Sequence, residues 1–506
     1  MTDELQNLPD DPTLLKQLLL QKEVLIAELK QEKQQLLEQF RLAQQKAFGA
    51  SSEGHPGQGQ LFDEAESEEQ AEESEPSTVE GHTRNKPKRK PLPADLPREV
   101  IVRDIPEEDK VCRCGGILHK IGEDRSERLE FIPAQVKVIE TVRPKYVCRC
   151  SETEDDHAEI KQAPVPPAII PKGIATPSLL SQIVTSKYQY GLPLYRQESM
   201  FKQYDIDLSR KTMADWMIRC AESLEILYNQ LRQILLQQAV IQADETTLKV
   251  VNEDKSTCYM WLYCSGSDSP VPDSPIPNIV LYDYQRSRSG RCAADFLDNY
   301  QGYLQVDGYA GYEQTLAVLV GCMAHARRKF MEAKQSQAKG KSGKADMALN
   351  QIQQLYAIEK RIQGKAPEEK HQIRQEKAVP LLNKFKVWLD KSSLQITPKS
   401  KMGDAIRYSQ NQWHKLIRYT EDGRLNIDNN RAERAIKPFV IGRKNWLFSN
   451  TARGAQASAI LYSIIETAKA NGLITFDYLN RLFEELPKRN TEDDISDLLP
   501  WNIKAS

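Results

Sequence analysis

The sequence has no hydrophobic run long enough to cross a membrane. Its longest apolar stretches, such as TLAVLVGCMA at 315–324, are shorter and more interrupted than a spanning helix requires. No basic segment followed by an apolar one opens the chain, so we do not expect secretion. These absences predict a cytoplasmic protein without a membrane partner.

Cysteine is sparse and odd in number, with nine residues in 506. An odd count argues against a disulfide framework and favours a reducing compartment with metal-bound or free thiols. Net charge is also small, at −2, but it is unevenly distributed. Residues 63–80 carry acids and no base, whereas residues 84–98 are mostly basic, so the total charge does not exclude a nucleic-acid partner.

The N-terminal segment predicts a helix that ends near Gly49. Residues 13–47 lack Pro and Gly, and apolar residues recur at spacings of three and four, interrupted by Lys22 and Lys33. This pattern is typical of a short coiled coil that mediates self-association; the alternative is an amphipathic helix packed on its own chain. The apolar positions are Leu15, Leu19, Ile26, Leu29, Leu36 and Phe40.

Four cysteines come as two close pairs, separated by a stretch of alternating apolar residues. Paired thiolates on a β-rich connection are how small zinc ribbons bind their metal. Each pair is C-x-C, tighter than the usual C-x2-C, so His119 could replace one ligand. Unliganded reduced thiols are the alternative. The predicted zinc ligands are Cys112, Cys114, Cys148 and Cys150.

A Pro-rich extended segment precedes three helical patterns in residues 163–235. The stretch YRQESMFKQYDIDLSRKTMADWM is typical of a helix-turn-helix, in which Ser209 caps the second helix. Arg210 and Lys211 then lie on its first turn, where such motifs present side chains to DNA. An ordinary helical hairpin has the same pattern and is the alternative.

Residues 236–330 alternate strands with helices. Three strand patterns precede a helix, a fourth strand and a further helix. We expect the second and third strands to pair antiparallel with the first, and the first and fourth to be neighbours. This order predicts a ribonuclease-H-like core. A Lys- and Gln-rich helical insertion at 331–420 interrupts the core, which residues 421–487 complete.

Three carboxylates occupy informative positions in this core. Asp244 and Asp307 follow apolar strand segments, and Glu433 lies just inside a predicted helix that Asn429 or Asn430 can cap. Neighbouring strand ends and a helix suit a site that holds two divalent ions for phosphoryl transfer. A purely structural role for all three acids is the alternative.

Two further acids are alternative metal ligands. Glu245 follows the first aspartate directly and would face the opposite side of a continuing strand. Asp428 precedes the predicted helix and could instead cap it.

Basic residues accompany the acids and suit a phosphate-contacting surface; a solvated basic face is the alternative. His325 could position a phosphate, or it could be a satisfied core histidine. Trp446 could stack on an unpaired base, although a core aromatic is the simpler interpretation. The basic residues are Arg327, Arg328, Lys329, Arg431, Arg434, Arg443 and Lys444.

Ordered motifs over nearly the whole length carry a family resemblance. They are KAFGASSE, LPADLPRE, CGG…PKYVC, PKGIATPSLLSQIVTSKYQYGLPLYRQE, ADETTLKV, YLQVDGYAGY, C-x2-HARRKF, NNRAERAIKPFVIGRKNWLF and SIIETAKANG. In these motifs the chain resembles the main transposase of insertion sequence 66 elements. It departs from the pattern in its C-x-C pairs, in Met323 where similar proteins often have Trp, and in Ala50 where they often have Arg.

The resemblance implies a DDE-type transposase that acts through Asp244, Asp307 and Glu433 with magnesium or manganese. It implies binding of terminal inverted repeats and target DNA, DNA cleavage, strand transfer of a 3′-hydroxyl, and accessory proteins of the same element. Such a protein is nucleoid-associated when bound to DNA. Two competing interpretations remain, a nuclease with the same core and a DNA-binding regulator with vestigial acids.

Length and these patterns together predict a multidomain α/β protein. The expected division is a coiled-coil helix at 1–49, a flexible acidic and basic linker at 50–98, a zinc-ribbon-like domain at 99–162, a helix-turn-helix-like DNA-binding region at 163–235, the first part of the core at 236–330, the helical insertion at 331–420, the second part of the core at 421–487 and a C-terminal tail at 488–506.

Overall fold

The computed structural model describes residues 11–48, 136–147, 160–271, 274, 276–336, 343–490 and 493–503. Contacts divide the chain into two units, one formed by residues 1–68 and 164–506 and the other by residues 69–163. No helix in the described ranges combines the length and the apolar character needed to span a bilayer.

The described part of the smaller unit is a two-stranded antiparallel ribbon. In it, β1 (Lys145–Val147) pairs with β2 (Ile160–Gln162). Arg143 donates to the carbonyl of Ala163 at 2.8 Å, and the Gln162 amide donates to the carbonyl of Arg143 at 2.9 Å. The predicted linker and the four predicted zinc ligands, Cys112, Cys114, Cys148 and Cys150, lie outside the described residues.

Helix α1 (Pro12–Phe48) confirms the predicted N-terminal helix and its end before Gly49. Its polar side contacts the rest of the larger unit, because Glu38 accepts from the N–H of Lys401 and Arg41 donates to the carbonyl of Ser336, both at 3.0 Å. Its apolar side chains are exposed, including Leu36 at 60%. Among the described residues, most of the apolar stripe is therefore left uncovered by the rest of the chain.

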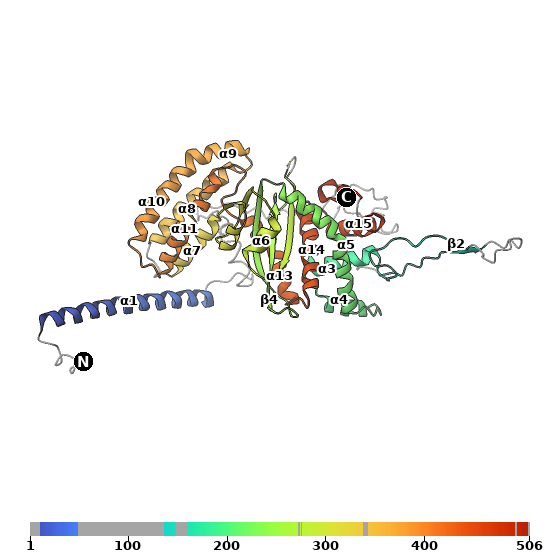
Figure 1. The fold of residues 1–506 in the computed structure, drawn as a ribbon, viewed down its shortest axis with the longest axis horizontal. Helices are drawn as coiled ribbons and strands as arrows, with labels where there is room; N and C mark the ends of the chain where they lie inside the picture. Colours follow the sequence, from blue (N-terminus) through green and yellow to red (C-terminus); the bar gives the residue numbers. More distant parts are fainter. Residues whose placement is uncertain are drawn as a thin grey trace, which may run out of the picture. The chain divides into compact units, whose positions relative to one another are not determined.

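A mixed five-stranded sheet forms the centre of the larger unit, with strand order β5-β4-β3-β6-β7 (Figure 1). The first strand, β3 (Val240–Lys249), pairs antiparallel with β4 (Thr257–Ser265), which pairs antiparallel with β5 (Ile279–Gln285). On the other side of β3, β6 (Tyr303–Gln305) and then β7 (Val318–Val320) run parallel to it.

The sheet confirms one expectation and corrects two. The first and fourth strands are neighbours, as predicted. The third strand, β5, pairs with β4 and not with β3. Strand β7 was not predicted, because its three residues belong to a short apolar run whose periodicity does not distinguish a strand from the start of a helix.

Helices cover the sheet and protect its β5 edge. Ser463 accepts a hydrogen bond from the N–H of Tyr282 at 2.8 Å, and Thr467 accepts one from the N–H of Val280 at 3.0 Å. These hydroxyls satisfy an edge that would otherwise be open to pairing with another strand. The helices outside the insertion are α3 (Pro177–Tyr188), α4 (Leu194–Lys202), α5 (Arg210–Leu236), α6 (Gly290–Leu297), α13 (Asn430–Trp446), α14 (Ala452–Ala470) and α15 (Thr475–Glu485).

Helices α4 and α5 occupy the segment that predicts a helix-turn-helix. Ser209 is the N-cap of α5, as expected, and accepts from the N–H of Thr212 at 3.1 Å. Arg210 and Lys211 are exposed on its first turn. Later turns of α5 are buried, with Leu224 inaccessible to solvent, so most of this helix is a core element. Its contact with DNA stays a prediction.

The segment between the second and third acids folds as helices with a core of their own. This second core contains Phe330, Phe385 and Tyr419, and is separate from the core under the sheet. In Figure 1 these helices gather on one side of the sheet, opposite α3, α5 and α14. They are α7 (Met323–Gln335), α8 (Lys344–Ile362), α9 (Pro367–Ile373), α10 (Val379–Ser393), α11 (Lys401–Asn411) and α12 (Trp413–Leu416).

Candidate active site

Asp244 and Asp307 each lie two residues beyond a registered pair of neighbouring parallel strands. Gln242 of β3 is in register with Gln305 of β6, and the chain continues from each to its aspartate. Asp307 lies just past β6, as predicted. Asp244 lies inside β3 and not at its end, because pairing with β4 continues to Lys249. On the side of β3 that faces β6, however, pairing ends at Gln242, before Asp244 is reached.

Glu433 lies in the first turn of α13, which is joined directly to the sheet. The Asn429 side-chain amide donates to the carbonyl of Ala243 at 2.8 Å, next to the first aspartate. Asn429 occupies the N-cap position, but its side chain makes no capping hydrogen bond. The expectation that an Asn side chain caps this helix is wrong for Asn429, because its amide nitrogen turns to the sheet and its Oδ1 accepts no hydrogen bond among the described residues. Asp428 instead accepts from the N–H of Asn430 at 3.2 Å.

A glutamine pair lies one layer below the aspartates and ties three segments together. The Gln242 amide donates to Gln305 Oε1 at 3.2 Å, which joins β3 to β6. Gln305 in turn donates to the carbonyls of Asn426 and Asp428 at 2.8 and 3.2 Å, and accepts from the N–H of Asn426 at 3.2 Å. The fully buried Gln305 therefore holds the chain that enters α13 against the strands of both aspartates.

The acids of the site repel one another. Burial raises the pKa of Asp244 well above its usual range, and the charges of Glu245, Glu433 and Asp307 raise it further. Burial also raises the pKa of Glu433 to about 7, against the opposing effect of Arg328. Carboxylates that remain this close in a buried site need a compensating cation to stay ionised.

Glu245 and Asp428, the two alternative metal ligands, make hydrogen bonds to other parts of the protein. Glu245 accepts from Arg288 at 2.5 Å and from the hydroxyl of Tyr312 at 2.5 Å, on the strand face opposite to Asp244. Asp428 accepts from the hydroxyl of Tyr356 at 3.0 Å, which comes from α8 of the insertion. Both acids therefore have structural partners.

His325 and Cys322 lie against Glu433 at the start of α7. His325 Nδ1 is 3.4 Å from Glu433 Oε1, and an Arg328 nitrogen is 3.5 Å from Glu433 Oε2. Burial and the charge of Arg328 lower the pKa of His325 to about 4, so its imidazole is neutral at pH 7. Its Nδ1 has no hydrogen-bond partner among the described residues, and a role of His325 in positioning a phosphate stays a prediction.

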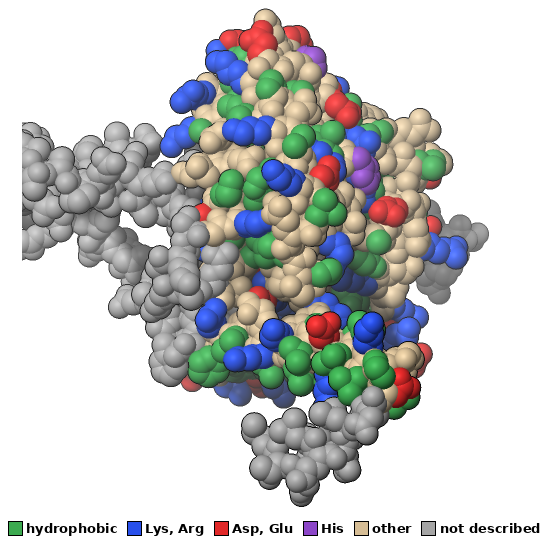
Figure 2. Space-filling model, turned by 90° about the vertical axis from the view of Figure 1, so that its left-hand side faces the viewer, with side chains coloured by type: hydrophobic (Ala, Val, Ile, Leu, Met, Phe, Trp, Pro, Cys, Tyr) green, Lys and Arg blue, Asp and Glu red, His purple; other side chains and the backbone are tan. Residues whose placement is uncertain are grey.

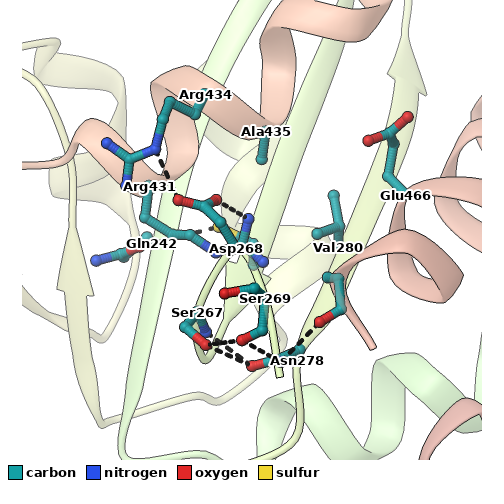
Figure 3. Close-up of polar contacts among 12 residues, drawn as sticks. Gln242, Ser267, Asp268, Ser269, Asn278, Val280, Arg431, Arg434, Ala435 and Glu466 are labelled. Atoms are coloured by element: carbon teal, nitrogen blue, oxygen red, sulfur yellow. Dashed lines mark hydrogen bonds and ion pairs between the residues drawn. The ribbon is translucent and has the colours of Figure 1, made fainter. Parts of the chain in front are cut away.

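An acid from the loop between β4 and β5 binds two arginines at the start of α13, one before and one after Glu433 in the sequence. Figure 3 shows Asp268 between Arg431 and Arg434, whose guanidinium groups donate to its two oxygens at 2.6 and 2.7 Å. The loop is in turn held by Asn278, which accepts from the N–H of Ser267 at 2.7 Å. These contacts add a second anchor for the helix that carries Glu433.

The other predicted DNA contacts differ in exposure. Lys444 is exposed, whereas Arg327, Arg328 and Lys329 are half-buried on α7. Arg443 donates to the Thr246 and Thr247 hydroxyls of β3 at 3.2 and 3.1 Å, so it holds the end of α13 on the sheet. Figure 2 shows one face of the molecule, where Lys and Arg side chains are spread among apolar and acidic ones.

Trp446 fits the expectation of a core aromatic. Its ring packs edge-on against Phe439 with centroids 5.5 Å apart, and it is partly buried on the core.

Several residues of the site were not predicted from the sequence. Asn429, Gln242 and Gln305 join segments that are remote in the chain, and no local pattern indicates such partners. Tyr408 of α11 also reaches the site, since a Cβ on Gly308 would lie 2.8 Å from its ring. Gly308, directly after an acid at a strand end, was the available signal for a close approach of this kind.

Comparison with protein families covers most of the chain. A model described as "Transposase IS66 family" matches residues 172–457, which include all three acids. A model described as "zinc-finger binding domain of transposase IS66" matches residues 109–151, which include the four paired cysteines. Models described as "Transposase C of IS166 homeodomain" and "IS66 C-terminal element" match residues 35–101 and 463–501.

Similar proteins occur in Sinorhizobium fredii. The uncharacterized protein y4jD is 34% identical over 430 residues, which cover 82% of this chain and 82% of that protein. The uncharacterized protein y4qI is 34% identical over 441 residues, covering 83% of this chain and 79% of that protein. No solved structure matches the chain significantly.

Proposed function

This chain belongs to the transposase IS66 family, and we propose that it cuts DNA at the ends of its element and joins the freed 3′-hydroxyl to target DNA. One observation carries the proposal. β3 and β6 run parallel and in register up to Gln242 and Gln305, two residues before Asp244 and Asp307, and the Asn429 amide ties the start of the Glu433 helix to Ala243. This arrangement supports a site formed by three acids from remote segments of the chain.

The sheet supports a ribonuclease-H-like core. Three antiparallel strands come first, then a helix and two strands parallel to the first, with β3 in the middle, which is the order expected of such a core. Helix α13 then adds the third acid from the layer packed on β3.

The donor set fits hard divalent cations. Carboxylate oxygens are the ligands that magnesium and manganese prefer, and the mutual repulsion of these buried acids favours a bound cation. Asp244, Asp307 and Glu433 would hold the ions. Once bound, the ions would supply Lewis-acid activation of a water or 3′-hydroxyl and stabilisation of the leaving oxygen.

Side chains of the protein would position the reacting DNA strand. Arg328 offsets the charge of Glu433, and the neutral His325 beside it can accept or donate a hydrogen bond to DNA. In the joining step, the oxygen of the 3′-hydroxyl attacks a target phosphorus and loses its proton, and the 3′-oxygen of the broken target strand leaves. Exposed Arg210, Lys211 and Lys444 would contact DNA phosphates.

The proposed transposase function also implies a structural metal, a second copy of the chain and further proteins. Zinc in the paired-cysteine segment would stabilise a DNA-binding ribbon, and α1 would bring two copies together on two element ends. Accessory proteins of the element complete the expected set.

A strand-transfer assay with labelled element-end DNA and magnesium tests the proposal. We expect joined products from the wild type and none from Asp244→Asn or Asp307→Asn, with Asp298→Asn, an exposed aspartate after α6, as the matched control. Cleavage without joined products would support the nuclease instead. End-specific binding that all variants share, with neither cleavage nor joining by the wild type, would support the regulator.

A further inference from the structure

A sulfur, a nitrogen and an oxygen ligand atom meet beside the carboxylate triad. Cys322, His325 and Glu433 each offer one atom, and these atoms lie within 4.8 Å of one another. Cys322 is the N-cap of α7 and His325 lies in its first turn, so one helix start supplies both. Glu433 comes from the first turn of α13. Two helix ends therefore point three different donors at one place.

The spacing of two of these atoms is that of metal ligands. His325 Nδ1 and Glu433 Oε1 are 3.4 Å apart. Two ligands about 2.0–2.1 Å from a tetrahedral ion are roughly 3.3–3.4 Å from each other. Both atoms are buried and have no hydrogen-bond partner among the described residues. Glu433 as a whole is 4% exposed, so this orphaned oxygen is aimed into the site and away from water.

The surroundings of the sulfur suit a thiolate ligand. Cys322 is fully buried, and the N–H of Asn429 donates to its Sγ at 3.2 Å. Without a metal, burial holds the pKa of this thiol well above its usual range, so metal binding would release a proton.

Charge around the cluster does not exclude a cation. The positive charges of Arg328 and Lys329 on α7 act on the site, and the negative charges of Asp307 and Asp428 offset them. A thiolate, a neutral imidazole and a carboxylate together carry two negative charges, which a divalent ion neutralises.

We propose that Cys322, His325 and Glu433 form a zinc site, separate from the paired-cysteine segment, with its fourth position open to water or to a phosphate oxygen. Thiolate and imidazole ligands favour zinc over magnesium, which prefers oxygen alone. Glu433 would then serve either zinc or the carboxylate triad. This last consequence rests on the proposed function: zinc at this site withdraws Glu433 and inhibits strand transfer.

Metal binding by the full chain tests the site without DNA. Zinc alone is titrated into metal-free wild type and into Cys322→Ser, His325→Gln and the half-buried control Cys292→Ser. We expect the control to bind as many zinc ions as the wild type, and the two site variants to lose one. Loss of a partner that only supports a ligand lowers metal affinity by roughly 10–100-fold. Loss of a ligand itself should lower the zinc affinity of this site by at least as much.

Cobalt alone gives a second readout, because a thiolate ligand produces a charge-transfer absorption band. His325→Gln keeps the test valid if Cys322→Ser fails to fold by circular dichroism. Equal zinc counts and equal affinities in His325→Gln, the control and the wild type would overturn the site. Since DNA is absent, a chain that binds this zinc but never joins DNA would refute only the proposed function.

Discussion

At the scale of single residues, the site depends on amides as much as on acids. Asn429 links α13 to the strand of Asp244, and Gln305 links β6 to β3 and to the start of α13. The acids were visible in the sequence because they follow β-branched apolar runs or begin a helix. The amides were not, because their partners lie far away in the chain and an isolated Asn or Gln carries no periodicity.

Removing the Asn429 amide should loosen α13 from the sheet. Asn429→Ala loses a buried 2.8 Å hydrogen bond to the Ala243 carbonyl, so we expect the free energy of unfolding to fall by about 1–3 kcal/mol. Urea denaturation measures the change. The exposed Asn299→Ala is the control and should change stability by less than about 0.5 kcal/mol. Equal stability of the two variants would contradict the anchor.

The glutamine pair should behave non-additively. Gln305→Leu leaves the Gln242 amide and the Asn426 N–H unpaired, and we expect a loss on the order of 2–5 kcal/mol. Gln242→Leu removes fewer contacts and should cost about 1–3 kcal/mol. The double variant should lose less stability than the sum of the two single losses, since each single change leaves the other amide without its partner. Additive losses in chemical denaturation would show that the two amides act independently.

At the scale of elements, the strand and helix patterns were readable and their pairing was less so. The long patterns of β3 and β4 gave the correct strands, but β5 was assigned to the wrong neighbour because alternation does not specify a partner. β7 was missed because three residues are too few to show a period. The helical insertion was recognisable from its periodicity, although its own core was not foreseen.

Arg374 should be a stability determinant of the insertion. It is 1% exposed, donates to Glu359 at 2.6 and 2.9 Å, and binds the carbonyls of Tyr419 and Leu425. Arg374→Met removes hydrogen bonds from the part-buried Glu359 carboxylate and from the Tyr419 and Leu425 carbonyls, and we expect a loss on the order of 2–4 kcal/mol.

Hydrogen exchange distinguishes a local effect from a global one. We expect Arg374→Met to accelerate exchange in 344–425 more than in the strands at 240–285, because the insertion has a separate core. The exposed Arg361→Met on α8 serves as the control. Uniform acceleration across both regions would contradict an independently weakened insertion.

At the scale of the whole molecule, α1 presents an apolar stripe while its polar side contacts the larger unit. The family model that covers residues 35–101 includes the end of this helix. Such a stripe is stable in water when a second copy covers it.

A charge in the stripe should therefore separate the copies. We expect Leu36→Glu to shift the full chain toward monomer in sedimentation velocity, because a charge at a seam position disrupts apolar packing between helices. Gln21→Glu adds the same charge on the exposed outer side of α1 and should leave the association unchanged. A monomeric wild type, or two variants that associate equally, would count against this interface.

The insertion between β7 and α13 also sets when the site becomes complete. A ribosome makes Asp244 and Asp307 first, and Glu433 follows only after helices α8 to α12 have been synthesised. A nascent or truncated chain therefore carries two acids and lacks the third. On the proposed function, such a chain cannot assemble its metal site, so cutting would wait until the insertion and the first turn of α13 have both been made.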